Sequence, residues 1–125
     1  MRIADTSALY ASFVQGDRHH EESRGLFASA EPTVVPAEIF SETLGLLQLR
    51  VGFPAARDAG SAIRSTPHVR VEPTSAAFLV HAWDEYEAAA GRLSFADAVV
   101  VAWCLGATAS AITFDKEIAR RTRGR

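Results

Sequence analysis

Short apolar segments alternate with longer helical patterns along the chain, and this alternation constrains the fold more than any other feature. Strand character falls on residues 3–4, 33–35, 69–71 and 110–113. Helical patterns cover residues 6–14, 19–30, 36–51, 54–65, 74–90, 94–105 and 116–121. Long helical connections between successive strands are typical of a parallel sheet covered on both faces. We therefore predict an α/β fold forming one domain over residues 1–125, a length that suffices for a single core.

The sequence shows no sign of membrane insertion or export. No apolar run approaches the ~20 residues that span a bilayer, and Asp5 interrupts the N-terminal apolar segment before a signal peptide can form. Cys104 is the only cysteine, so the chain cannot form an internal disulfide. Its apolar neighbours indicate a buried, unreactive thiol. We expect a cytoplasmic protein without a membrane partner.

Charge is unevenly distributed along the chain. The net charge is −2, whereas residues 116–125 contain five basic residues and one acid, a balance of 5 − 1 = +4. The preceding residues therefore carry −2 − 4 = −6. An acidic body with a basic tail could hold a metal ion at one place and contact phosphate at another. A solvated terminus explains the tail equally well.

Four acids stand where the chain changes character. They are Asp5, Glu42, Asp97 and Asp115. Asp5 and Asp115 follow apolar segments and would lie at the carboxyl ends of strands, where parallel sheets gather polar function. Three of the acids also have a purely structural interpretation. Asp5 and Asp115 could cap the helices that follow them, and Asp97 could form a capping box with Ser94.

Helix phase sets Glu42 apart from the other acids. With Ile39 at zero and ~100° per residue, Leu46 falls at ~340°, Leu49 at ~280° and Glu42 between them at ~300°. Glu42 is thus expected inside an apolar arc, where a carboxylate needs a partner. Glu38 lies at the edge of this arc in the first turn, where the helix dipole favours negative charge.

Converging carboxylates repel one another unless a cation joins them. A donor set of oxygens, without cysteine or clustered histidine, favours Mg²⁺ or Mn²⁺ over zinc or copper. His19 and His20 lie among charged residues and are expected to be solvated. Phosphate-loop, dinucleotide and nucleophile-elbow motifs are absent from the sequence. Three large aromatic residues at helical positions favour core packing or a protein interface over base stacking; these are Trp83, Tyr86 and Trp103.

Four segments in this order resemble the PIN-domain ribonucleases, and among them the VapC toxins of bacterial and archaeal toxin–antitoxin pairs. They are Ile3-Ala4-Asp5-Thr6-Ser7-Ala8, Glu42 within a helix, Leu93-Ser94-Phe95-Ala96-Asp97-Ala98, and Ile112-Thr113-Phe114-Asp115-Lys116. The resemblance covers almost the full length. Each motif is weak alone, whereas the ordered set is fairly specific.

The resemblance implies a three-layer α/β/α sandwich with a parallel four- or five-stranded sheet. It implies Mg²⁺- or Mn²⁺-dependent endonuclease action on RNA by the four acids, with Asp5, Asp97 and Asp115 as metal ligands. Ser7 and Thr113 would support that cluster. It also implies a VapB-like antitoxin and a homodimer. Family members often have a strand after the last helix; the basic tail stands there instead, which leaves the fifth strand open.

Three further expectations stay open. Arg18, Arg120 and Arg121 could contact RNA phosphates, although a solvated role fits each equally well. The main alternatives to a toxin are a non-catalytic RNA-binding or scaffold module of the same fold and a housekeeping RNA-processing nuclease without an antitoxin. A phosphatase or receiver domain using Asp5 as phosphoacceptor is a weaker alternative, because the sequence has no Asp-x-Asp-x-Thr motif.

Overall fold

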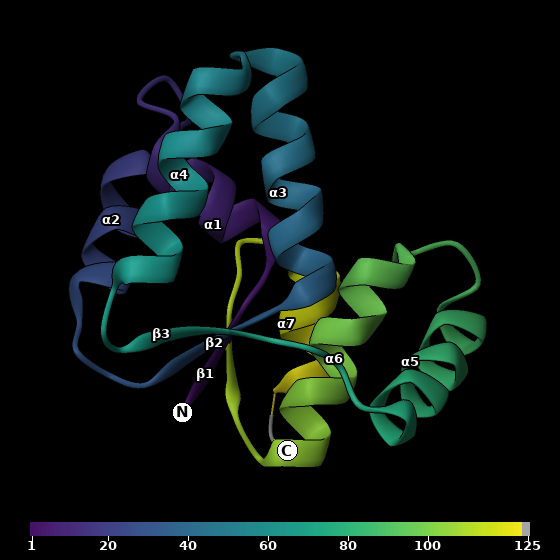
Figure 1. Cartoon of the computed structure of the whole chain (residues 1–125). Coiled ribbons are helices and arrows are strands. Elements are labelled where there is room, and N and C mark those ends of the chain that lie inside the picture. Colours follow the sequence, from purple (N-terminus) through teal and green to yellow (C-terminus); the bar gives the residue numbers. More distant parts are fainter. Residues whose placement is uncertain (124–125) are drawn as a thin grey trace.

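The computed structural model describes residues 1–123, and its elements follow the alternation expected from the sequence (Figure 1). In chain order they are β1 (Arg2–Ala4), α1 (Thr6–Phe13), α2 (His20–Ala28), β2 (Thr33–Pro36), α3 (Ala37–Arg50), α4 (Phe53–Ser65), β3 (Val69–Glu72), α5 (Ala76–Ala89), α6 (Phe95–Ala107), β4 (Ser110–Ile112) and α7 (Lys116–Thr122). Arg125 of the basic tail and any fifth strand after α7 lie outside the described residues.

The four strands form one parallel sheet in the order β3-β2-β1-β4. Ile3 of β1 lies opposite Val34 of β2 on one side and Ala111 of β4 on the other. The chain moves outward from β1 through β2 to β3 and then returns to the far side of β1 for β4. The carboxyl ends of β1 and β4 therefore flank a topological switch point, where open α/β sheets form their ligand crevices.

Helices cover both faces of the sheet, as expected for a three-layer sandwich. Figure 1 shows α1, α2 and α4 grouped on one side of the strands, with α5, α6 and α7 on the other. Helix α1 packs on α2 and α3, α3 packs on α4, and α6 packs on both α5 and α7. Gly106 allows the close approach of α5 to α6, because a Cβ atom there would overlap the Phe78 ring.

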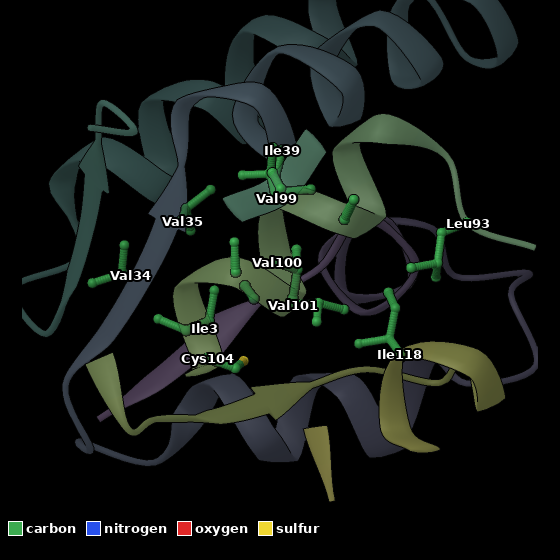
Figure 2. Packing of buried hydrophobic residues seen from close by; sticks show 14 of the residues in the cluster. Ile3, Val34, Val35, Ile39, Leu93, Val99, Val100, Val101, Cys104 and Ile118 are labelled. Carbon is green, nitrogen blue, oxygen red and sulfur yellow. The ribbon is translucent and has the colours of Figure 1, made fainter. Parts of the chain in front are cut away.

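Helix α6 is the centre of the core, in agreement with its nearly continuous apolar sequence. Val99, Val100 and Val101 are fully buried. Figure 2 shows their side chains among those of the strands and α7, including Ile3 and Ile118. Burying each such side chain contributes roughly 1.5–3 kcal/mol. The core therefore fixes the position of the α6 N-terminus, where Asp97 lies.

Element boundaries differ slightly from those expected. Pro36 ends β2, opposite Glu72 of β3, instead of beginning the helix that follows. Proline is tolerated there because it is the last residue of the strand, where its missing N–H removes at most one hydrogen bond of the sheet.

Within residues 1–123, every helix is too short or too polar to cross a membrane.

Candidate functional site

Asp5 lies at the switch point, directly after β1, and is almost fully buried, with 1% of its surface exposed. One carboxylate oxygen accepts the Ala8 N–H at 2.9 Å and caps α1, as the sequence suggested. Ser7 Oγ donates to both oxygens, at 2.9 and 3.0 Å, and Thr113 Oγ1 donates to Oδ2. These bonds hold the carboxylate in one orientation.

Burial raises the pKa of the Asp5 carboxyl from 3.8 to about 6. The three donors oppose this shift because they favour the charged form, and the charge of Asp97 adds to it. The carboxylate is therefore costly in the protein alone, even with its hydrogen bonds in place. A nearby positive charge would remove that cost.

Asp97 stands at the start of α6 and forms the expected capping box with Ser94. Its carboxylate accepts the Ser94 N–H at 3.1 Å, and Ser94 Oγ accepts the Asp97 N–H at 3.1 Å. Burial raises the pKa of Asp97, against the two Ser94 bonds, and the charges of Asp115 and Glu42 raise it further. The charges of all four acids thus act on one another, although the acids come from four separate segments.

Asp115 caps α7 through the Ile118 N–H at 2.9 Å, so this third cap is also confirmed. Thr113 connects it to the centre of the site. The Thr113 hydroxyl donates to Asp5 and accepts the Asp115 N–H at 2.9 Å. Ser7 and Thr113, expected to support the acids, are thus both bonded to Asp5.

Glu42 reaches the site from α3, where it accepts a hydrogen bond from Thr6 Oγ1. The prediction that Glu42 lies inside an apolar arc of α3 is wrong. Leu49 is 82% exposed, and the buried face of α3 is formed by Ile39, Thr43 and Leu47. A leucine on a helix is not always buried, because the neighbouring elements decide which face of the helix is covered. Glu42 is a half-exposed residue at the edge of the site.

A cleft of about 370 Å³ opens at two of these acids, Glu42 and Asp97. It is lined by Thr6, Ser7, Tyr10, Asp17, His19, Glu42, Leu46, Arg50, Ser94 and Asp97. Arg50 is the one Lys or Arg in this lining, and its guanidinium lies 5.4 Å from the centroid of the Tyr10 ring. Arg50 was not among the residues predicted from the sequence. The signal was its spacing, since Glu42, Leu46 and Arg50 follow one another at i, i+4 and i+8 along one helix face.

The chemistry of the donors fits a hard divalent cation. All four acids offer oxygen ligands, and within residues 1–123 none of them forms a salt bridge. Glu42, Asp97 and Asp115 each use one carboxylate oxygen in a hydrogen bond and leave the other without one among the described residues. In that same part of the chain, no three His, Cys, Asp or Glu side chains stand close enough to hold a metal ion. Metal binding would therefore require the less tightly held acids, Glu42 and Asp115, to move toward Asp5 and Asp97.

The three arginines expected at RNA have different surroundings. Arg18 is exposed, and its Nε donates to His19 Nε2 at 3.1 Å, beside the cleft. Arg120 pairs with Glu117, and Arg121 pairs with Glu117 at 3.5 Å and Glu85 at 3.6 Å. The Arg121 side chain is only 13% exposed. The structure places Arg18 against His19 of the cleft lining and engages the other two in ion pairs.

Two expectations about single residues have clear outcomes. The solvated state expected for His19 and His20 is wrong, because both rings are half-buried. His19 stacks on Phe114, and His20 Nδ1 lies 2.7 Å from the Ala11 carbonyl oxygen. The inert thiol is confirmed: Cys104 is buried, and burial raises its pKa to about 12.

Comparison with known proteins gives concordant results. The chain matches the PIN domain over residues 2–124. It is 38% identical over 85 residues to the 23S rRNA-specific endonuclease VapC20 of Mycobacterium tuberculosis, in strains CDC 1551 / Oshkosh and ATCC 25618 / H37Rv. That match covers 67% of this chain and 64% of the relative's length.

The fold agrees with a solved structure. The crystal structure of Mycobacterium tuberculosis VapC20, described as a sarcin-ricin loop cleaving toxin, superposes with a TM-score of 0.83 at 29% identity. The superposition covers 96% of this chain and 94% of that chain. The chain therefore belongs to the PIN domain family and, within it, resembles the VapC toxins.

Proposed function

We propose that this chain is a metal-dependent endoribonuclease, the VapC-like toxin of a toxin–antitoxin pair, that hydrolyses RNA phosphodiester bonds with Mg²⁺ or Mn²⁺. The observation that carries the proposal is the gathering of four carboxylates without a positive partner. Burial and mutual repulsion raise the pKa values of Asp5 and Asp97. A purely structural cluster would be expected to contain a lysine or arginine to balance these charges.

Each acid has a role suited to its surroundings. Asp5 is fixed by three donors, and Asp97 is held at the end of a buried helix, so these two would be the most rigid metal ligands. Asp115 would complete the ligand set, with Glu42 at its edge. When bound, the metal ion would lower the pKa of a water molecule and neutralise charge developing on the phosphate.

The chain's own residues would supply the remaining functions. Glu42 or Asp115 would accept a proton from the attacking water. The accepting atom would be the carboxylate oxygen that forms no hydrogen bond among the described residues. Arg50, which lines the cleft, would pair with a phosphate of the RNA. Arg18 at the rim would contact a second phosphate. Arg120 and Arg121 are weaker candidates because glutamates already pair with them.

The first substrate to test is a hairpin of the sarcin–ricin loop of 23S rRNA, since related proteins are named for that activity. We expect cleavage with Mg²⁺ or Mn²⁺, none with excess chelator, and none by Asp5→Asn in either condition. A hairpin of the same composition with a scrambled loop controls for nonspecific nuclease. Equal cleavage in all conditions would refute the metal mechanism. RNA binding without cleavage would favour the non-catalytic module.

We also propose a protein partner, namely a VapB-like antitoxin, and a homodimer. An exposed apolar surface on α5 supports a protein contact; it contains Leu79, Val80, Trp83 and Tyr86. Val80 is 66% and Trp83 52% exposed, and contiguous surfaces of this kind commonly mark interfaces. Light scattering on wild type and Trp83→Glu tests the dimer. An unchanged monomer mass in both would refute it.

A further inference from the structure

Two aromatic rings from distant parts of the chain stack beside the acidic cleft. His19 precedes α2, and Phe114 lies between β4 and α7. Their ring centroids are 4.1 Å apart and the ring planes differ by 6°. The acidic chemistry proposed above uses neither ring.

Backbone hydrogen bonds hold the segments that carry the two rings, and the one at Phe114 links its segment to the acids. Phe114 lies between Thr113 and Asp115, and its N–H donates to Ser7 Oγ at 3.3 Å. The same Ser7 hydroxyl donates to Asp5. On the other side, the His19 N–H donates to Asp17 Oδ1 at 2.9 Å. The backbone at Phe114 is therefore tied to the residue that holds Asp5, and the His19 ring stacks on the Phe114 ring.

The stack is open to the cleft. His19 is half-buried and lines the cleft together with Glu42 and Asp97. The hydrogen bond from Arg18 reaches a ring nitrogen of His19. Such a bond lies near the plane of the ring and does not cover its face. Phe114 backs one face of the imidazole, and the ring contributes to the cleft lining.

A packing role alone explains the contact between the two rings but not its place at the opening of the cleft. Unpaired bases of single-stranded nucleic acids stack on aromatic side chains, and an RNA base is of suitable size for the imidazole ring. The guanidinium of Arg18 beside the platform supplies positive charge for the adjoining phosphate.

We infer that His19, backed by Phe114, is the platform on which an unpaired RNA base beside the scissile phosphodiester stacks. This inference rests on the proposed ribonuclease function. His19 would be a positioning residue for the substrate and not a proton-transfer group. The platform would select nucleotides in loops, because a base inside a duplex already stacks on its neighbours.

Binding is tested without cleavage, in the Asp97→Asn background with chelator present. The probe is the sarcin–ricin hairpin with 2-aminopurine placed in turn at each loop purine, since its fluorescence falls when the base stacks. We expect quenching at one position, its loss in His19→Leu, and its retention in His19→Phe. Fluorescence anisotropy should show roughly tenfold weaker binding for His19→Leu, within the range for loss of one stacked base.

His81→Leu is the matched control, because His81 is a partly exposed histidine on α5 that pairs with Glu85 instead of lining the cleft. It should leave both signals unchanged. Phe114→Leu removes the backing ring and should also reduce quenching. It carries the test if His19→Leu fails to fold, as judged by circular dichroism.

The outcomes distinguish this inference from the proposed ribonuclease function on which it rests. If the hairpin binds by anisotropy and quenching is equal with and without the His19 ring, the platform is refuted and the nuclease proposal stands. If no variant binds the hairpin, both are refuted. In the active enzyme, a fall in kcat/KM for His19→Leu that His19→Phe restores would support the platform.

Discussion

Two acidic regions of this protein handle negative charge in opposite ways. The acidic cleft region contains Asp5, Glu42, Asp97 and Asp115, of which Glu42 and Asp97 line the cleft itself. No described lysine or arginine pairs with these four carboxylates. In the arginine-paired cluster between α5 and α7, every carboxylate has a cation. This second cluster consists of Glu85, Glu117, Arg92, Arg120 and Arg121.

The pKa shifts follow this difference. A hydrogen bond from Arg120, followed by the charges of the neighbouring arginines, lowers the pKa of Glu117 below its usual 4.5. Burial raises the pKa of Asp5 to about 6. The arginine-paired cluster is electrostatically complete within the chain. The acidic cleft is not, which is the expected state of a site that takes its cation from solution.

The largest expected contrast is in catalysis. Asp97→Asn should lower kcat/KM on the hairpin at least about 1,000-fold, or ~4 kcal/mol, because a neutral amide is a poor ligand for a hard cation. The amide oxygen can still accept the Ser94 N–H, so the fold should persist. Glu117→Gln, the matched change in the arginine-paired cluster, should leave kcat/KM within about threefold. Comparable losses in both variants would contradict the division of roles.

The two regions should also respond oppositely to pH when metal is removed. Between about pH 4 and pH 6, folded Asp5 holds a proton that the unfolded chain has released, so stability falls as pH rises, by up to ~3 kcal/mol. Glu117 contributes stability above pH 4.5 that is lost as pH falls through its lowered pKa. Urea unfolding at each pH measures both effects.

Two variants separate these contributions. Asp5→Asn should remove the loss of stability between pH 4 and pH 6, since asparagine also caps helices and carries no charge. Glu117→Gln should leave that loss intact and weaken the acid-dependent change below pH 4.5. A wild-type pH profile preserved in Asp5→Asn would show that the carboxyl does not carry the effect.

Metal addition should stabilise the acidic cleft alone. At 10 to 100 times its Kd, Mg²⁺ or Mn²⁺ should raise the free energy of unfolding of wild type at pH 7 by about 1.4–2.7 kcal/mol. Glu117→Gln should gain as much, and Asp5→Asn should gain little. Thermal melts with and without chelator provide the measurement. An equal gain in Asp5→Asn would place the metal elsewhere.

The smallest expected effect concerns the support of Asp5. Thr113→Val removes a hydroxyl donor to the buried carboxylate, which should raise the pKa of Asp5 further and cost about 1–2 kcal/mol of stability at pH 7. Thr113→Ser keeps the donor and serves as the control. Chemical denaturation compares the two. A loss in Thr113→Ser equal to that in Thr113→Val would contradict the role of the hydroxyl, because serine keeps the hydroxyl and loses only the methyl group.

Local patterns predicted much of the fold. The apolar run after Ser94 indicated a buried helix, and α6 is the centre of the core because no polar face competes with its burial. The helix caps at Asp5, Asp97 and Asp115 were also predictable, since a cap bonds an N–H only three residues away. From the sequence, a helix cap and a role in the site were alternative interpretations of each acid. In the structure, all three acids form their caps and still belong to the acidic site.

Longer-range features were not predictable from local patterns. Leu49 was expected to be buried from helix phase but faces solvent, because the elements that cover α3 reach only another face. Arg121 was expected either to contact RNA or to be solvated, and its ion pair with Glu85 on a different helix was not predicted. His19 was expected in solvent but stacks on a ring 95 positions away, 114 − 19 = 95.

The sequence alone determined which residues are acidic, the order and approximate extent of the segments, and that the sheet is parallel, because these depend on neighbours a few positions apart. Only the tertiary structure decided that the four acids act on one another, that Thr113 joins Asp5 to Asp115, and that arginines neutralise one acidic region and not the other. Charge interactions fall off with distance and depend on burial. Both quantities are set by how the strands and helices pack, not by their order in the chain.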